Sequence, residues 1–228
     1  MFECCPICSA KEKDEQPQCG THCYTTVYEC GCAIDRCFGD NEWWEYSQRC
    51  DEPPKRSVMD QLMYPDTFNI AYAQETLPGF CRSSIFLAGP TPRDENTQSW
   101  RPEAVEILQK KDFKGWLYIP EMKDGWSSDF EYSNQIEWEE EGLTKAAVIV
   151  FWVPRELEKM PAFTTNVEWG YWVAKNPDKL VLGYPKDTPK MNYLDYYAKK
   201  LKIPVVHKLD EALDVALNKI EVGKKKRR

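Results

Sequence analysis

Acidic side chains that could move a proton or attack carbon occur in two segments, one with a single glutamate and one with four. Glu168 stands alone in the segment 163–170, whereas four glutamates fall within five residues further upstream: Glu137, Glu139, Glu140 and Glu141. A carboxyl group beside a second one has a raised pKa and can act as an acid, and two carboxylates flanking a glycosidic bond suffice to cleave it. Simpler interpretations stay open. Glu168 could complement a helix dipole, and the upstream cluster could be a solvated helix face.

A proline-framed loop offers a second candidate group. Gly89-Pro90-Thr91-Pro92-Arg93 follows a short apolar run. Glycine lets backbone approach a ligand closely, the prolines fix the loop shape, and Thr91 and Arg93 supply a hydrogen-bond donor and a cation. By itself the segment is equally compatible with an ordinary strand-to-helix turn.

Cysteines dominate the beginning of the chain: nine of the ten lie at or before Cys50. With no basic-then-apolar leader at the N-terminus, we expect a reducing compartment, where clustered thiols more often bind metal than form disulfides. The pair Cys5 and Cys8, with Cys30 and Cys32, predicts a closed, structural zinc site of four thiolates. Cys4, Cys19, His22, Cys23 and Cys37 compete for this role, and three of them could make a second site.

Apolar runs alternate with segments of helical periodicity after residue 84. The runs predict strands at 85–88, 116–119, 148–152, 180–182 and 205–206, and the periodic segments predict helices at 99–110, 133–145, 164–174, 193–200 and 209–220. This alternation predicts an α/β domain, a five-stranded parallel flavodoxin-like sheet with helices on both faces. Ligands of such sheets bind beyond the carboxyl ends of the strands, where Gly89–Arg93 and Glu168 would lie.

The domain organisation follows from these patterns. We expect a Cys-rich, zinc-ribbon-like domain at 1–50, a linker at 51–83 that starts at the paired prolines, the α/β domain at 84–220 and a basic tail at 221–228. Paired prolines stiffen the chain and interrupt regular structure.

Several segments in this order resemble the nucleoside 2-deoxyribosyltransferase-like family, in the branch with a Gly-Pro-Thr-Pro-Arg loop. Besides 85–93, they are 135–139, 151–155, 164–170 and 182–185, and the resemblance covers about residues 84–217. It implies that Glu168, in Val167-Glu168-Trp169-Gly170, is a catalytic nucleophile. It also implies that Glu139, with Glu137 as the fallback, contacts and protonates the leaving base.

Further expectations rest on the same resemblance. Gly89, Pro90, Thr91, Arg93, Asn166 and Tyr184 would bind the substrate. The substrate would be a 2-deoxyribonucleoside or its monophosphate, the intermediate a glycosyl ester of Glu168, and no cofactor would be needed for catalysis. Many relatives carry Tyr where this chain has Phe86, so an orienting hydroxyl is missing or comes from Tyr184 or Tyr118. Relatives also complete their sites across subunits, which predicts a homo-oligomer. Four aromatic rings on two adjacent expected helices would lie at its interface, unless they fill the core: Trp138, Trp169, Tyr171 and Trp172.

Charge and hydropathy limit the partners. The net charge is -7, and residues 1–52 hold 11 acidic and 4 basic side chains, a poor surface for phosphate backbones. No apolar run approaches the length of a membrane span. We therefore expect a cytoplasmic enzyme without membrane or nucleic-acid partners. The alternative is a catalytically inactive nucleotide sensor or zinc-ribbon binding module.

Overall fold

The computed structural model divides the chain into two compact units, Met1–Gln61 and Leu62–Arg228. It describes residues 62–79, 81–93, 96–123 and 132–225, together with the backbone of four strands before residue 50. None of the described helices is long and apolar enough to cross a membrane.

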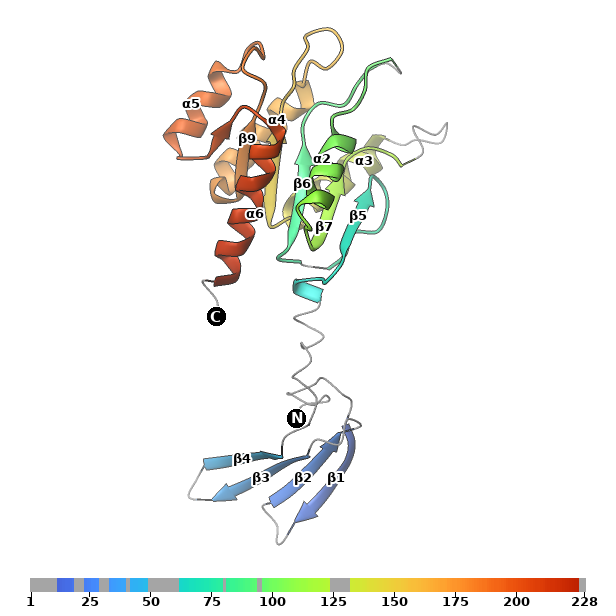
Figure 1. Ribbon diagram of the computed structural model, residues 1–228, viewed down its shortest axis with the longest axis vertical. Helices are drawn as coiled ribbons and strands as arrows, with labels where there is room; N and C mark the ends of the chain where they lie inside the picture. Colours follow the sequence, from blue (N-terminus) through green and yellow to red (C-terminus); the bar gives the residue numbers. More distant parts are fainter. Residues whose placement is uncertain are drawn as a thin grey trace. The chain divides into compact units, whose positions relative to one another are not determined.

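The first unit contains a four-stranded antiparallel sheet in which neighbours in sequence are neighbours in space (Figure 1). Its strands are β1 (Glu12–Gln18), β2 (Cys23–Tyr28), β3 (Ala33–Gly39) and β4 (Glu42–Gln48). The β2–β3 register makes Cys23 and Cys37 backbone partners. The predicted zinc ligands Cys5, Cys8, Cys30 and Cys32 lie outside the described residues.

The second unit is built on a parallel sheet of six strands in the order β10-β9-β8-β6-β7-β5. The strands are β5 (Phe68–Tyr72), β6 (Ser84–Ala88), β7 (Gly115–Ile119), β8 (Val148–Trp152), β9 (Leu180–Gly183) and β10 (Val205–Val206). Without β5, the order is that of a flavodoxin-like sheet, 2-1-3-4-5. The α/β class and the parallel sheet expected from the sequence are therefore confirmed.

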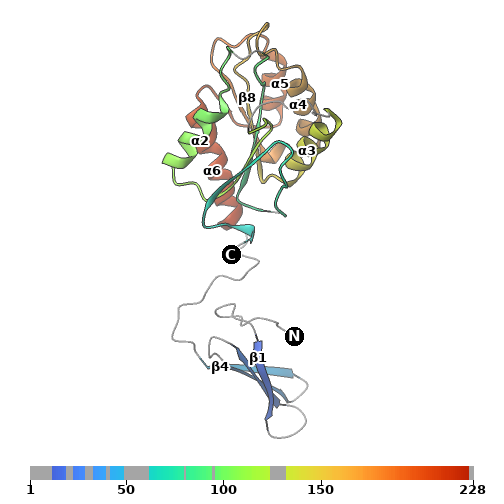
Figure 2. The ribbon, with the colours of Figure 1, turned by 90° about the vertical axis from the view of Figure 1, so that its right-hand side faces the viewer.

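Helices cover both faces of this sheet (Figure 2). On one face, α2 (Arg101–Lys110) and α6 (Leu209–Lys225) pack on Ile85, Leu87 and Val150. On the other, α3 (Tyr132–Lys145), α4 (Phe163–Lys175) and α5 (Asn192–Lys200) pack on Phe86, Ile149 and Phe151. β6 and β8 are buried at every position, which explains why their sequences are continuous apolar runs rather than alternating ones.

The sheet has six strands, so the expectation of five was wrong. The additional strand β5 pairs with β7 in parallel, with Phe68 opposite Gly115 and Tyr72 opposite Ile119. It lies in the range expected as linker, and the α/β unit begins at Leu62 rather than at residue 84. At the other end, α6 continues to Lys225, so most of the expected tail is helical.

Four aromatic rings on α3 and α4 were expected to crowd an interface surface, and for three of them this was wrong. Trp138, Trp169 and Trp172 are buried, and Trp169 packs edge-on against Phe151 with ring centroids 5.2 Å apart. Only Tyr171 is exposed. The exposed apolar side chains of α4 form a different set, spaced at four residues: Phe163, Val167 and Tyr171.

Two helical glycines predict opposite effects of the same substitution. A Cβ on Gly142 of α3 would lie 2.8 Å from the ring of Phe86, whereas Gly223 of α6 has open space around it. Alanine favours helices by about 1 kcal/mol over glycine, but overpacking a core costs about 1–3 kcal/mol. We expect Gly142→Ala to destabilise the protein and Gly223→Ala to stabilise it slightly, as measured by thermal and denaturant unfolding. Equal effects of both would contradict the packing of α3 on β6.

Candidate functional site

A cavity of about 230 Å³ opens beyond the carboxyl ends of β6 and β8. These strands are neighbours, yet the chain leaves β6 for α2 on one face of the sheet and β8 for α4 on the other. Such a point of divergence is where open α/β sheets bind ligands. The cavity is lined by Gly89, Pro90, Thr91, Arg93, Arg101, Pro120, Glu139, Pro161, Ala162, Phe163, Thr164 and Glu168.

The loop after β6 forms one wall. Gly89 has a φ of +153°, and a Cβ there would lie 2.1 Å from the backbone oxygen of Trp152, so only glycine lets the loop leave the sheet here. The indole nitrogen of Trp100 donates to the Pro90 carbonyl at 3.1 Å. On the cavity side, the backbone of Arg93 donates to Lys159, and its guanidinium lies 5.3 Å from the ring centre of Phe163.

Helix α4 brings Glu168 to the cavity as its sixth residue. Ala162 precedes the helix with a φ of +61°, a conformation that residues with a Cβ adopt rarely. The first turn contains no acidic residue, which weighs against Glu168 being there mainly to complement the helix dipole. Buried Arg155 holds this end of α4, because its guanidinium donates to Asn166 Oδ1 at 2.6 Å and to the Lys190 carbonyl at 2.9 Å.

Helix α3 supplies the second carboxylate, Glu139. One turn earlier, the buried amide of Gln135 donates to Glu139 Oε1 at 2.7 Å, which fixes the carboxyl group. The indole of Trp138 anchors the same turn of α3 by donating to the Glu75 carbonyl at 2.7 Å. Glu137 is exposed and does not line the cavity, so among the described residues Glu139 is the acid of α3 that reaches it.

Burial makes both carboxyl groups hard to ionise. The pKa of Glu168 is raised to about 8, first by burial and then by the charge of Glu139, whereas Arg101 acts in the opposite direction. The pKa of Glu139 is also raised by burial, while the hydrogen bond from Gln135 and the charge of Arg101 lower it. Two such groups share protons as a pair, and strongly raised pKa values are typical of functional carboxylates. The cavity can therefore hold one ionised and one protonated carboxyl group at neutral pH.

Six of the eight catalytic and substrate-binding residues expected from the sequence line this cavity: Gly89, Pro90, Thr91, Arg93, Glu139 and Glu168. Asn166 and Tyr184 do not. The side chain of Asn166 accepts from Arg155, and the Tyr184 hydroxyl donates to Asp195 Oδ1 at 2.6 Å.

The two tyrosines that could have supplied the hydroxyl missing from Phe86 also lie outside the cavity. Phe86 is wholly buried, with its ring against Gly142 and 6.1 Å from that of Trp138. Neither Tyr118 nor Tyr184 lines the cavity.

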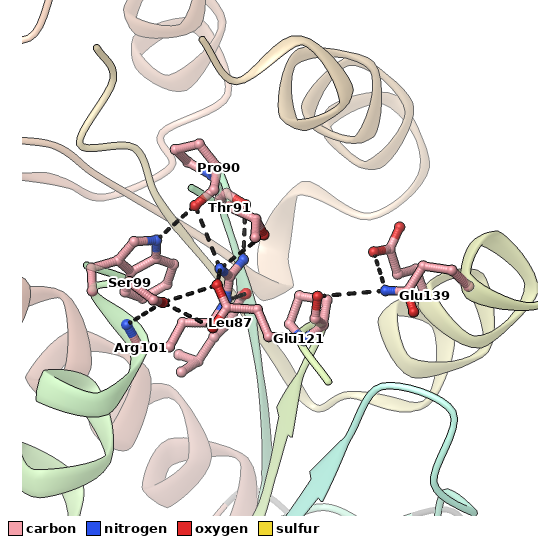
Figure 3. A network of polar contacts seen from close by, with 11 residues as sticks. Leu87, Pro90, Thr91, Ser99, Arg101, Glu121 and Glu139 are labelled. Carbon is pink, nitrogen blue, oxygen red and sulfur yellow. Dashed lines mark hydrogen bonds and ion pairs between the residues drawn. The ribbon is translucent and has the colours of Figure 1, made fainter. Parts of the chain in front are cut away.

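Two charged residues of the site were not anticipated. Arg101, the first residue of α2, is only 1 % exposed and pairs with Glu121 at 2.5 Å (Figure 3). An arginine at the start of a helix is ordinarily exposed, so nothing local in the sequence announces its burial. Glu121 could have been found, because it follows the expected strand at 116–119 and so stands at the carboxyl edge of the sheet.

Comparison with known families bears on this geometry. Residues 82–188 match the family described as nucleoside 2-deoxyribosyltransferase like. The matched range holds every residue that lines the cavity. The family resemblance expected from the sequence is confirmed over this range, and it suggests an enzyme of glycosyl transfer on nucleosides. No curated protein matches the chain.

The raised pKa of Glu168 predicts a dependence of stability on pH. A carboxyl group whose pKa is higher in the folded state loses stabilisation as the pH rises from its unfolded pKa, about 4.3, to its folded one, about 8. We expect Glu168→Gln, which cannot ionise, to gain stability over the wild type between pH 5 and pH 8.5, on the order of 3 kcal/mol. Denaturant unfolding at several pH values measures this, with exposed Glu137→Gln as the control. A difference that does not change with pH would contradict the burial of this carboxyl group.

Proposed function

We propose that the α/β unit transfers or hydrolyses the N-glycosidic bond of 2-deoxyribonucleosides or their monophosphates. The observation that carries this proposal is the pair Glu168 and Glu139 in one cavity, beside the Gly89–Arg93 loop, within the matched range. Two carboxyl groups of unequal protonation are the equipment that glycosidic cleavage requires.

The proposed reaction runs through two displacements. The raised pKa of Glu168 keeps the proton of the pair on this residue at rest, so the reactive form is the one in which that proton has moved to Glu139. Ionised Glu168 then attacks the anomeric carbon, so that a carbon–oxygen bond forms while the bond to the base nitrogen breaks. Protonated Glu139 gives its proton to the departing base as general acid. In the second displacement a new base or water takes the sugar from Glu168, and Glu139 recovers a proton from it. The configuration at the anomeric carbon is thereby retained. All these steps use side chains of the protein alone.

We also propose a homo-oligomer, with its contact on α4 instead of on the four aromatic rings expected from the sequence. Phe163, Val167 and Tyr171 form an exposed apolar stripe on α4, the helix that carries Glu168. Exposed apolar patches often mark interfaces, and a symmetric dimer is the commonest assembly. Light scattering at micromolar concentration tests this: a fully active monomer would contradict a shared active site.

Removal of either carboxyl group should have distinct consequences. We expect Glu168→Gln to abolish base release, because an amide is a far poorer nucleophile than a carboxylate. Glu139→Gln should slow it by about 10²–10⁴-fold, the usual worth of a general acid. The measurement is chromatography of deoxynucleosides and their monophosphates incubated with each variant, with and without an acceptor base.

Glu137→Gln is the matched control on α3 and should retain activity, since Glu137 is exposed and does not line the cavity. Glu168→Gln turnover within a few-fold of the wild type would overturn the assignment. The alternative function, a nucleotide sensor, predicts instead that ligands stabilise the wild type against unfolding without any release of base.

For the N-terminal unit we propose a structural zinc site formed by Cys5, Cys8, Cys30 and Cys32. Their spacing supports the proposal, since paired thiolates separated by a short ribbon typically close a tetrahedral site. Among the residues with described side chains, which exclude these four, no group of potential ligands could hold a metal. Such a site would contribute folding energy rather than chemistry.

Elemental analysis should find about one zinc per chain, or two if the remaining cysteines form a second site. Cys5→Ser combined with Cys8→Ser should remove zinc and expose residues 1–50 to protease, while base release persists. Cys81→Ser is the matched control, because Cys81 is a buried thiol of the α/β unit and its loss should leave the zinc content unchanged. Full-length protein that holds no zinc yet resists protease in this segment would refute the site.

A further inference from the structure

Among the described cations of the α/β unit, Arg101 is the most deeply buried. Its guanidinium is almost wholly buried, 4.7 Å from the ring centre of Trp100. Burying an unpaired guanidinium would be very costly, so each nitrogen needs a partner. The partners come from two parts of the sheet edge: the end of β6 with its loop, and Glu121 after β7.

The hydrogen bonds of Arg101 follow the backbone of the loop that forms one wall of the cavity (Figure 3). Nε donates to the Leu87 carbonyl at 3.3 Å and Nη2 to the Gly89 carbonyl at 2.8 Å. Nη1 donates to the Pro90 carbonyl at 3.4 Å and to Thr91 Oγ1 at 3.2 Å. One side chain therefore fixes the loop from Leu87 to Thr91. A lysine ammonium could not do so, because it lacks the planar fork of donors.

Glu121 forms an ion pair with Arg101 and so partly neutralises the positive charge of the guanidinium. Its carboxylate accepts from Arg101 Nη1 at 2.5 Å, and Ser99 Oγ donates to both of its oxygens at 2.9 Å. Such a charge-assisted pair, held by a third group, is stronger than a neutral hydrogen bond. It joins the carboxyl end of β7 to the start of α2.

The charge of Arg101 also acts on the two carboxyl groups across the cavity. It lowers the pKa of both Glu168 and Glu139, against the effect of burial. Among the described residues, the charged groups that line the cavity or pair with Arg101 are Glu168 from α4, Glu139 from α3, Glu121 after β7 and Arg93 in the loop after β6. Arg93 is exposed to solvent, so its charge is screened more strongly than that of Arg101.

We propose that Arg101, tuned by Glu121, is a positioning residue of this site, which holds the Gly89–Thr91 loop in shape and keeps a buried positive charge facing Glu139 and Glu168. The inference rests on the proposed function, since it assigns Arg101 a part in that reaction. Two separable effects follow: one on the shape of the substrate loop, and one on the ionisation of the carboxyl pair.

Three variants separate these effects. Arg101→Gln removes both the positive charge and the planar set of donors. Arg101→Lys keeps the charge but not the planar donors. Glu121→Gln keeps the guanidinium and removes the carboxylate that neutralises it. Lys111→Gln is the matched control. Lys111 follows the last residue of α2 and is paired with Asp210 and Asp214 of α6, at the other end of the helix from the cavity.

The readouts are the pH profile of base release and a carbon-13 NMR titration of labelled glutamate carboxyl groups, which requires no turnover. We expect Arg101→Gln to raise the pKa of Glu168 by about one unit and Glu121→Gln to lower it by a similar amount, since a nearby opposite charge favours the ionised form. The limbs of the pH profile should move in the same directions. Arg101→Lys should restore the pKa but leave KM raised, because the loop stays loose.

The outcomes distinguish this inference from the proposed function. If no substrate in the panel loses its base with the wild type, the proposed function fails, whatever the titration shows. If the wild type is active but Glu121→Gln and Arg101→Gln titrate like Lys111→Gln, the role of Arg101 is overturned. Should Arg101→Gln fail to fold, the other two variants still test the inference. An unchanged KM in Arg101→Lys together with an unchanged pKa of Glu168 in Glu121→Gln would also overturn it.

Discussion

The chain leaves the neighbouring strands β6 and β8 toward opposite faces of the sheet, and the other features of the site depend on this divergence. A crevice has to open where the two connections separate, and it is here that the cavity lies. The close approach of the Gly89 backbone to Trp152 keeps the two strand ends together below it. Helix α4 therefore starts at the cavity, whereas α3, which precedes β8, ends at the opposite edge of the sheet and presents its first turns to the crevice.

This arrangement places two carboxyl groups in a space where water cannot easily compensate their charge. Burial raises both pKa values, and the charge of Glu139 raises that of Glu168 further, so Glu168 still holds a proton near neutral pH. The charge of Arg101, which also lines the cavity, limits this effect. The folded protein thus keeps a carboxyl group ready to donate a proton at the cost of some stability, a common feature of active sites.

Much of the fold was predictable because its elements are buried on defined faces. The strands at β6 and β8 are continuous apolar runs, and the helices carry apolar residues at regular spacing, so their ends were predicted to within about two residues, except for α6, which is five residues longer. β5 was missed because it is a five-residue edge strand in which only Ala71 is buried. Its sequence, Phe-Asn-Ile-Ala-Tyr, becomes a strand through pairing with β7, which no local pattern reveals.

The residues of the candidate site were likewise predictable in part, and the rest depend on contacts between distant segments. Glu168 and the Gly89–Arg93 loop follow strands, so topology alone directs them to one edge of the sheet. Which of Glu137 and Glu139 lines the cavity depends on the rotation of the helix about its axis. In the structure it is Glu139, whose carboxyl group accepts from Gln135. The burial of Arg101 arises from contacts with Leu87, Pro90 and Glu121, which are distant in sequence, so it could not be read from residues around position 101.

The central claim is that Glu168 becomes covalently attached to the sugar. Mass spectrometry of protein quenched in acid during turnover of a deoxynucleoside, followed by digestion, tests it most directly. We expect the peptide that contains Glu168 to gain the mass of one 2-deoxyribosyl group, and no other peptide to gain it. Steady release of base with no such adduct at any time of quenching, or with the adduct on a different residue, would contradict it.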